Sequence, residues 1–294
     1  MLDFTPNAVH AGIYAALAHG YDRADGVRLQ VVAPTASTDP IKLLETGRAT
    51  FAILDIHDLA IARERGAAIV GLMAIVERPL AAVIAAPPVR TPRALAGRTV
   101  GVTGVPSDQA VLDSIVRGAG GDPRRLKLVT IGFDAVPDLL AGRVAAATAF
   151  WNDEGVSIRR RASGFHVFRV EDYGAPAYPE LILCATRATL ATRAALVRGT
   201  VRALTRGYAF ALGHPGAAAS ELESRVNGLD PGLVSAELQA LLPAFRAPDG
   251  RVGELSARVL RLWAAWEARF HIVPRPPSVS GDFDTQLTGP AGPG

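Results

Sequence analysis

The sequence predicts an α/β protein with two lobes, and three observations lead to this prediction. Short runs rich in β-branched residues recur through the first 190 residues, helical patterns separate many of them, and only helical patterns follow residue 187. Alternating strands and helices favour largely parallel sheets. The length of 294 residues agrees with two domains, at a typical size of about 150 residues each.

The individual elements follow from these patterns in chain order. Residues 8–19, for example, place Val9, Ile13 and Leu17 on one helical stripe. We expect strands at residues 27–32, 50–54, 69–76, 80–85, 99–102, 127–131, 144–150, 167–170 and 181–184. We expect helices at residues 8–19, 107–117, 190–212, 217–226, 231–242 and 253–270.

Two segments of the chain resemble each other. In residues 43–52 and again in residues 139–147, a helix end is followed by a glycine suited to a left-handed turn and then by a strand. Polar residues follow each strand, at the end where open α/β sheets bind their ligands. We therefore expect two lobes that face one cleft.

The lobes are not expected to be sequential halves. A proline-rich segment at residues 85–98 is suited to cross into a second lobe, and a return crossing is expected near residues 179–186. Lobe 1 would then comprise residues 1–88 and 184–274, and lobe 2 residues 89–183. The end of the chain, residues 275–294, is expected to form a flexible tail.

Composition excludes several classes of protein. The formal net charge is only +3 and the one dense basic run is residues 159–161, so we expect no binding of nucleic acid. Cys184 is the single cysteine, which rules out a disulfide framework, and the histidines lack metal-site spacing. No apolar run is long enough to span a membrane. We expect a periplasmic or membrane-anchored extracellular protein if a leader precedes residue 1, and a cytoplasmic protein otherwise.

Two strand-to-helix junctions carry candidate ligand-binding residues. Asn7 precedes a helix that contains His10, and residues 104–108 (GVPSD) end a strand and start another helix. Free N–H groups at such helix starts bind anionic or oxygen-rich groups. Asn7 and Ser107 are equally suited to be simple helix caps.

Two further segments join an aromatic ring to a carboxylate, at residues 151–154 (WNDE) and 178–180 (YPE). A ring and a carboxylate suit a flat, nitrogen-containing ligand, through stacking and charge-assisted hydrogen bonds. The alternative is that Trp151 belongs to the core and Glu154 to a helix start. We expect no catalytic residues. Ser107, His57 and Asp55 match the residue types of a catalytic triad, but no nucleophile-elbow pattern surrounds Ser107.

Several motifs together resemble the THI5/NMT1-like family. Residues 2–12 (LDFTPNAVHAG) resemble the family's LDWTPNTNHTG opening, and residues 95–101 (LAGRTVG) and 104–108 also fit. The resemblance covers residues 2–270 and implies a type II periplasmic-binding-protein fold that closes around a small heteroaromatic ligand. Within the family, the sequence is most similar to substrate-binding proteins of ABC importers for thiamine-precursor pyrimidines, such as formylaminopyrimidine or hydroxymethylpyrimidine.

The resemblance implies a small-molecule ligand and a membrane permease as partners, no cofactor, and a monomer. Glu154 is expected on the amino–ring edge of the pyrimidine, with Trp151, Phe4 or Tyr178 on its face. The full set of residues expected to bind the ligand is Phe4, Asn7, His10, Asp55, His57, Gly104, Pro106, Ser107, Asp108, Trp151, Asn152, Glu154, Tyr178 and Glu180.

The same family contains a pyridoxal-phosphate-dependent enzyme that consumes its own histidine, which matches His57. The lysine that holds its cofactor matches Ile53, and an apolar side chain cannot form a Schiff base. Its cysteine-rich segment has no counterpart near residues 175–179. We therefore expect a binding protein, and keep as alternatives a cytosolic pyrimidine-synthesis enzyme, a ligand sensor, and a binding protein for riboflavin or a sulfonate.

Overall fold

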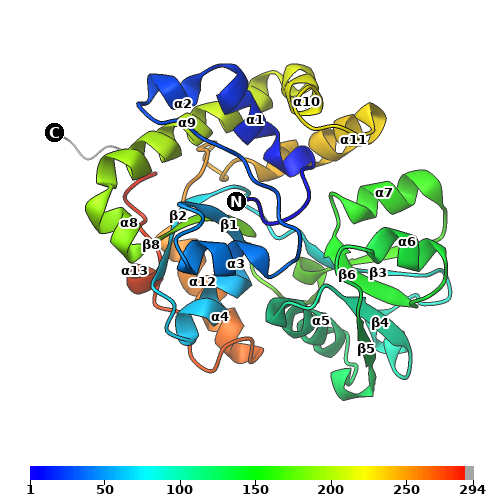
Figure 1. Ribbon diagram of the computed structural model, residues 1–294. Helices are drawn as coiled ribbons and strands as arrows, with labels where there is room; N and C mark the ends of the chain where they lie inside the picture. The colour runs from blue at the N-terminus through cyan, green and yellow to red at the C-terminus, as the bar shows by residue number, and fades with distance from the viewer. Residues whose placement is uncertain (289–294) are drawn as a thin grey trace.

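The computed structural model describes residues 1–288, apart from the side chain of Pro106, and in it the chain forms two lobes with separate sheets (Figure 1). The strands are β1 (Ala52–Asp55), β2 (Ile69–Ala74), β3 (Ala81–Ala85), β4 (Thr99–Val102), β5 (Lys127–Thr130), β6 (Ala146–Phe150), β7 (His166–Arg169) and β8 (Leu181–Thr186). Lobe 1 contains the sheet β1–β8–β2, and lobe 2 contains the sheet β5–β4–β6–β3–β7. The α/β class predicted from the alternating pattern is therefore confirmed.

The prediction of largely parallel sheets is wrong. β8 runs antiparallel to β1 and β2, and β3 runs antiparallel to β6 and β7. In the described residues, the parallel pairs are β4 with β5 and β4 with β6. A parallel neighbour requires a crossover connection within one sheet. β3 and β8 instead enter their sheets directly from the other lobe, and the strand pattern alone did not show this.

The sheets place both crossings earlier in the chain than the sequence suggested. β3 belongs to lobe 2, so the first crossing precedes residue 81 rather than following residue 88. β8 belongs to lobe 1 from Leu181 onward, so the return crossing ends before residue 181 rather than at 184. In the sheet topology, the strands of lobe 2 lie between β2 and β8 of lobe 1 in the chain.

Helices cover both sheets. In lobe 1, a 3-10 turn (Ala8–His10) precedes α1 (Ala11–Ala18), and the remaining helices are α2 (Tyr21–Ala24), α3 (Asp39–Glu45), α4 (Ile56–Glu64), α8 (Arg187–Thr192), α9 (Ala194–Gly213), α10 (Pro215–Glu223), α11 (Pro231–Leu241), α12 (Ala257–Arg269) and α13 (Val279–Asp282). Lobe 2 carries α5 (Pro106–Gly118), α6 (Ala135–Leu140) and α7 (Glu154–Arg161). Within the described part of the chain, none of these helices is long and apolar enough to cross a membrane.

The predicted helices are confirmed with shifts of up to four residues at their ends, except that residues 190–212 span two helices, α8 and α9, which are separated at Arg193. Two extended segments form no strand. Residues 27–32 and the first residues of the chain each make isolated ladder bonds, from the Leu2 N–H to the Val32 carbonyl and from the Ile53 N–H to the Met1 carbonyl. They lie beside β1 without a continuous ladder. The start of the chain is thus held at the edge of the lobe 1 sheet.

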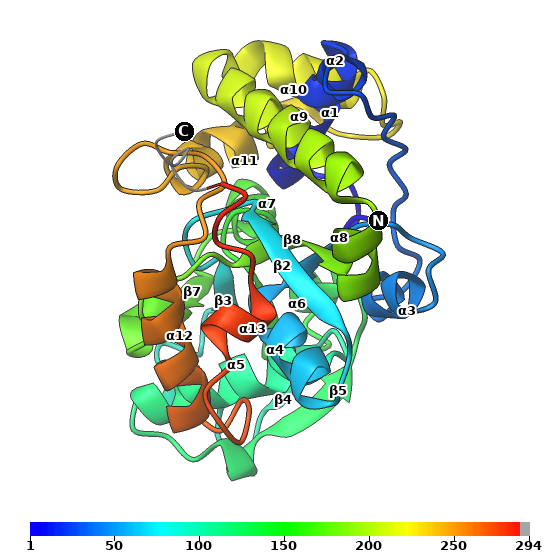
Figure 2. The same ribbon diagram turned by 90° about the vertical axis from the view of Figure 1, so that its left-hand side faces the viewer.

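The predicted flexible tail is wrong for its described part. α13 lies against β2, as Figure 2 shows, and Phe283 forms a bridge with Gly71. The Phe283 ring is buried and contacts the Trp263 ring edge to face at 5.7 Å. Residues 289–294 of that prediction lie outside the described residues.

Candidate functional site

A cavity lies between the two lobes and encloses roughly 890 Å³ of empty space, part of it open to solvent. Its walls come from the N-terminal segment, β1 and α4 of lobe 1 and from β6, α5 and α7 of lobe 2. The lining residues are Asp3, Phe4, Ser37, Pro40, Ile41, Ile53, Leu54, Asp55, Asp58, Ala81, Ala82, Thr103, Val105, Ser107, Asp108, Val111, Phe133, Thr148, Ala149, Phe150, Asp153, Glu154 and Leu181.

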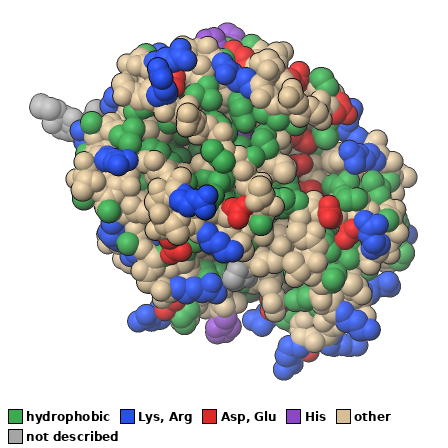
Figure 3. All heavy atoms as spheres, viewed as in Figure 1, with side chains coloured by type: hydrophobic (Ala, Val, Ile, Leu, Met, Phe, Trp, Pro, Cys, Tyr) green, Lys and Arg blue, Asp and Glu red, His purple; other side chains and the backbone are tan. Residues whose placement is uncertain are grey.

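The charged groups of this lining are all acidic. They are the six cleft carboxyls, Asp3, Asp55, Asp58, Asp108, Asp153 and Glu154, and no lysine, arginine or histidine joins them among the described lining residues. Figure 3 shows acidic side chains in the hollow between the lobes, whereas basic side chains lie around the outer surface. Such a lining repels anions and favours ligands that are cationic or rich in hydrogen-bond donors.

The loop before α5 positions Asp108. Pro106 begins this helix, where a proline is well tolerated, and the Asp108 carboxylate accepts hydrogen bonds from the Thr103 N–H (2.5 Å) and the Thr148 hydroxyl (2.9 Å). Burial nevertheless raises the pKa of Asp108, and the bonds from Thr103 and Thr148 only partly offset it. Both Ser107 and Asp108 line the cavity, as expected from the sequence.

Glu154 opens α7 at the lobe 2 wall. Its Oε2 accepts a hydrogen bond from the Phe150 N–H at 2.9 Å. Burial, with the neighbouring Asp153 carboxyl, raises the pKa of Glu154 to about 8, although the Phe150 N–H opposes the shift. At neutral pH the group therefore keeps its proton and offers both a donor and an acceptor to the cavity.

Asn7 and His10 support the cavity rim without lining it. The Asn7 side chain caps the 3-10 turn by accepting from the Val9 N–H, and its Nδ2 donates to Asp153 Oδ2 across the cleft at 2.6 Å. His10 contacts Asp3 at 3.0 Å. The capping alternative is thus the observed one for Asn7. Both side chains fix the cleft carboxyls that they touch.

One aromatic pair faces the cavity. Phe4 of lobe 1 and Phe133 of lobe 2 meet edge to face with their ring centroids 4.4 Å apart. Trp151 does not line the cavity, because its Nε1–H donates to the Pro79 carbonyl and Arg169 lies 4.2 Å above its ring. The expected aromatic contribution of Phe4 agrees with its position, and that of Trp151 does not. Asn152 is also buried outside the lining.

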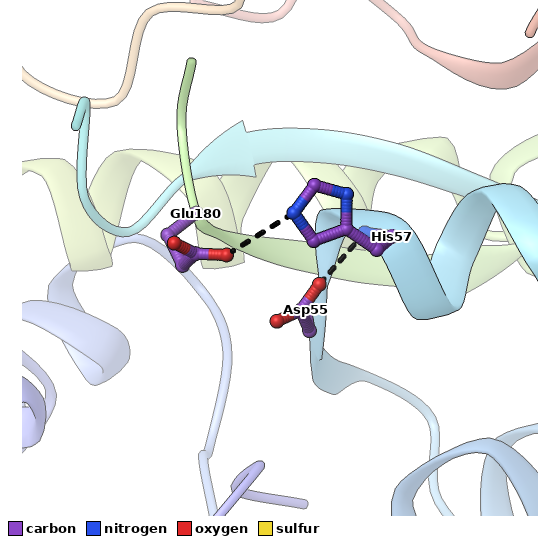
Figure 4. Close-up of side chains that lie close together, drawn as sticks. All are labelled: Asp55, His57 and Glu180. Carbon is purple, nitrogen blue, oxygen red and sulfur yellow. Dashed lines mark hydrogen bonds and ion pairs between the residues drawn. The ribbon is translucent and has the colours of Figure 1, made fainter. Parts of the chain in front are cut away.

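A second group of titratable side chains, the hinge cluster, comprises Asp55 on the cavity wall and, behind this wall, His57, Tyr178, Glu180 and Glu267. Figure 4 shows that His57 and Glu180 point toward each other, with 3.6 Å between Nε2 and Oε1. Nε2 of His57 also lies 3.0 Å from the Tyr178 hydroxyl, and Nδ1 contacts Glu267. His57, Tyr178 and Glu180 are fully buried and do not line the cavity, contrary to expectation.

The hinge cluster contains a buried cation. Burial alone would lower the pKa of His57, but the carboxylates of Glu267 and Asp55 raise it to about 10. His57 is therefore an imidazolium at neutral pH. Tyr178 is further held by its ring, which stacks on Trp266.

Glu180 ties the two crossings together. Its Oε2 accepts hydrogen bonds from the Leu80 N–H (2.5 Å) and the Ala81 N–H (2.8 Å), where the chain first enters lobe 2. Glu180 itself precedes β8, where the chain returns to lobe 1. Glu180 thus joins the two crossings through hydrogen bonds and does not line the cavity.

Ligating atoms of Asp55, His57 and Glu180 lie within 4.8 Å of one another, the one such grouping found in the described part of the chain. Both ring nitrogens of His57 already have partners, and a protonated imidazole has no lone pair for a metal ion. We therefore interpret this group as an ion-pair network.

The remaining expected residues belong to the loop before α5. Gly104 adopts φ +101°, a conformation that favours glycine, and does not line the cavity. The side chain of Pro106 lies outside the described residues. The loop therefore contributes to the cavity through Thr103, Val105, Ser107 and Asp108.

Several lining residues were not predicted from the sequence, above all Asp3, Asp58, Phe133 and Asp153. Asp58 and Asp153 each stand beside a residue that was selected, one in each of the two similar strand ends. The similarity between the two segments, each of which ends in a strand followed by polar residues, could therefore have identified Asp58 and Asp153. Phe133 lies in a loop without any motif, and only the fold brings it opposite Phe4.

The chain matches the family model described as NMT1/THI5 like over residues 7–218. It is 29% identical over 273 residues to the formylaminopyrimidine-binding protein of Halalkalibacterium halodurans. The aligned residues cover 90% of this chain and 83% of that protein. Among solved structures, it is similar to the alkanesulfonate-binding protein SsuA from Xanthomonas axonopodis pv. citri, with a TM-score of 0.75 and 16% identity over 94% of this chain and 95% of that one.

A protein from Bordetella bronchiseptica is also similar, with a TM-score of 0.80 and 15% identity over 98% of this chain and 94% of that one. At such identities, these likenesses show the fold alone. They confirm the two-lobed periplasmic-binding fold that the sequence predicted.

Proposed function

Because the chain belongs to the NMT1/THI5-like family, we propose that it is a solute-binding protein that closes on a thiamine-precursor pyrimidine. The formylaminopyrimidine-binding relative supports this ligand class. The observation that carries the proposal is the cleft itself, which combines apolar and aromatic walls with six carboxyls and, among its described residues, no basic side chain.

Glu154 recognises the edge of the pyrimidine that carries the amino group and the adjacent ring nitrogen. An aminopyrimidine presents a ring nitrogen acceptor beside an amino donor. A neutral carboxylic acid matches this edge with its O–H and its carbonyl, and the raised pKa of Glu154 keeps that form available. If the ring takes the proton instead, the same two atoms form a charge-assisted pair.

The ring itself lies near Phe4 and Phe133. These two side chains come from opposite lobes, and edge-to-face or offset aromatic contacts add to the burial of a flat ligand. A ligand packed against this pair contacts both lobes and favours their closure, because each lobe supplies one ring. Asn7 and Asp153, which are hydrogen-bonded across the cleft, assist the same closure.

The protein acts by binding and not by catalysis. Ile53 lines the cavity at the position that resembles the lysine of the enzymatic relative, so no Schiff base forms there. His57 is enclosed in the hinge cluster, away from the cavity lining. The acidic lining also disfavours a sulfonate, because an anion would meet six carboxyls without a cation.

The closed form would be delivered to an ABC permease in the membrane, with the protein working as a monomer outside the cytoplasmic membrane. The similarity to a formylaminopyrimidine-binding protein and the periplasmic-binding fold support this arrangement. Closure about the two crossings supplies the conformational signal that a permease reads.

Calorimetric titration with formylaminopyrimidine, hydroxymethylpyrimidine, riboflavin and an alkanesulfonate tests the proposal. We expect saturable one-to-one binding of at least one pyrimidine and none of the sulfonate. Saturable binding of riboflavin or the sulfonate, without binding of any pyrimidine, would overturn it. Added pyridoxal phosphate should give no aldimine absorbance band, because the cavity lining contains no lysine in its described residues.

A further inference from the structure

A second cavity, the lobe 1 cavity, lies apart from the cleft and encloses roughly 1320 Å³ of empty space, part of it open to solvent. Its walls come from the extended segment at residues 28–32, from α1 and α9, and from residues 48–51, which precede β1. Among the described residues, Ile53 alone lines both this cavity and the cleft. The two are therefore separate binding spaces.

The extended segment is a loosely attached wall. In Figure 2 it is part of the chain that joins α2 to α3 along the edge of lobe 1. The Leu29 N–H donates to Asp22 Oδ2 at 3.1 Å, and the Val32 carbonyl accepts from the Leu2 N–H at 2.9 Å. The two residues between these bonds make no backbone hydrogen bond within the described part of the chain. A wall held at so few points can yield to an entering ligand.

The charged side chains of the lobe 1 cavity are both basic. Arg28 and Arg48 belong to its lining, and no aspartate or glutamate joins them among the described residues. Both arginines are exposed, and neither makes an ion pair in the described part of the chain. The cleft has the reverse pattern, with acidic groups alone. Two unpaired guanidinium groups at the solvent end of an apolar space suit a carboxylate with an apolar body.

The interior of the lobe 1 cavity contains an unpartnered hydroxyl. Thr200 of α9 lines the cavity and is only 1% exposed. Its Oγ1 has no hydrogen-bond partner among the described residues, although a threonine within a helix commonly bonds to the carbonyl one turn earlier. A buried hydroxyl without a partner costs free energy, and a ligand oxygen would recover it.

We propose that the lobe 1 cavity binds an amphipathic monocarboxylate. The carboxylate lies on Arg28 and Arg48, and the apolar body packs on the leucine side chains of the wall, among them Leu196 and Leu204 of α9. An oxygen atom on that body bonds to the Thr200 hydroxyl. This second ligand is independent of the function proposed for the cleft, because different residues form the two cavities.

The lining disfavours other classes of ligand. A cationic amphiphile would place its charge beside two guanidinium groups. A small anion without an apolar body would leave the apolar walls without a partner and would meet only exposed arginines. A thiamine-precursor pyrimidine has no carboxylate for the arginines, and among its described residues the lobe 1 cavity has no carboxyl for the amino edge of that ring.

Calorimetric titration with octanoate, octylammonium, acetate and ethanesulfonate tests the proposal. We expect saturable one-to-one binding of octanoate and none of the other three, which lack either the negative charge or the long apolar body. Equal binding of octylammonium, or no saturable binding of octanoate, overturns the proposal. The result is valid whether or not a pyrimidine binds to the cleft, so the two proposals can fail separately.

Matched variants locate the site. Arg28→Gln and Arg48→Gln should each weaken octanoate binding by about fivefold or more, because each removes charge-assisted hydrogen bonds. Arg23→Gln in α2 is the control, since Arg23 is an exposed arginine outside the lining, and it should change affinity by less than about twofold. Equal weakening by all three variants would show a general attraction of the surface for anions and would overturn the site.

Thr200→Val tests the interior of the cavity. This variant removes a hydroxyl that has no partner in the described structure, so the melting temperature of the empty protein should not fall. At least one hydroxyoctanoate should bind more tightly than octanoate to the unaltered protein, and Thr200→Val should abolish this advantage. If no hydroxyoctanoate binds more tightly than octanoate, or if the advantage survives in the variant, the role given to Thr200 is wrong.

Discussion

The hinge cluster and the cleft carboxyls are both buried acidic groups, and they differ in whether the protein supplies a cation. In the hinge cluster, the His57 imidazolium lies among the carboxyls of Asp55, Glu180 and Glu267. In the cleft, Asp58 and Asp108 line a cavity with no basic side chain among its described lining residues, and they accept hydrogen bonds from Ser107 and from Thr103 and Thr148. The fold therefore supplies a counter-charge to the hinge cluster, but only neutral donors to these two cleft carboxyls.

Asp55 belongs to both regions and shows how close they are. It lines the cavity, and its side chain accepts from the His57 N–H at 2.7 Å as α4 begins. Burial raises its pKa well above the ordinary value, and the His57 charge opposes that shift. The His57 cation therefore keeps the pKa of Asp55 lower than burial alone would set it, so that this part of the cleft wall retains more negative charge.

The largest expected effect comes from removing the hinge cation. His57→Gln should lower the free energy of unfolding by about 3–5 kcal/mol, because it leaves buried carboxyls without their counter-charge. Urea denaturation followed by circular dichroism measures it. His19→Gln is the control, since its contact with Glu221 is partly exposed and is expected to contribute at most about 1 kcal/mol. A loss below that of the control would contradict the assignment of the hinge cation.

Sequence patterns predicted the elements of this fold better than their arrangement. Residues 99–102 and 181–184 were identified as strands from composition, and the glycines after two helices marked the two similar units. The direction of β3 and β8 and the limits of the lobes depend on which sheet each strand enters. That choice is made by packing across the two lobes, and no local pattern encodes it.

For the site, residues next to strand ends were predictable and residues placed by long-range packing were not. Ser107, Asp108 and Glu154 follow strands and line the cavity. His57 and Tyr178 carry equally suggestive side chains, yet α12 brings Glu267 and Trp266 against them and encloses them. Burial by a helix that comes so much later in the chain cannot be read from the residues themselves.

The next largest effect is the loss of pyrimidine affinity on substitution of Glu154. Two variants distinguish the contribution of its hydrogen bonds from that of its ionisable group. Glu154→Ala should weaken pyrimidine binding by about 1–3 kcal/mol, because two hydrogen bonds are lost. Glu154→Gln should retain more affinity than Glu154→Ala, since an amide also offers one donor and one acceptor to the edge. Calorimetry measures both, with Glu223→Gln in α10 as a control outside the cavity. Equal affinity of all three variants and the unaltered protein would remove Glu154 from the site.

The smallest expected effect is the pH dependence of the cleft, which differs from that of the hinge. The pKa of Asp58 is raised from 3.8 to about 6, first by burial and then by Asp108, while Ser107 and the His57 charge oppose the rise. The folded, empty protein therefore binds more protons than the unfolded chain between these values. Consequently, this group makes the empty protein less stable as the pH rises through that window.

Asp58→Asn removes this titrating carboxyl, so the loss of stability between pH 4 and pH 6 should become shallower in the variant. Asp153, whose pKa burial also raises to about 6, accounts for the slope that remains. Urea denaturation at pH 4, 5 and 6 measures both proteins, and an unchanged slope in the variant would assign the titration to another group. The hinge imidazolium, with its pKa of about 10, keeps its charge over this interval and does not contribute to the slope.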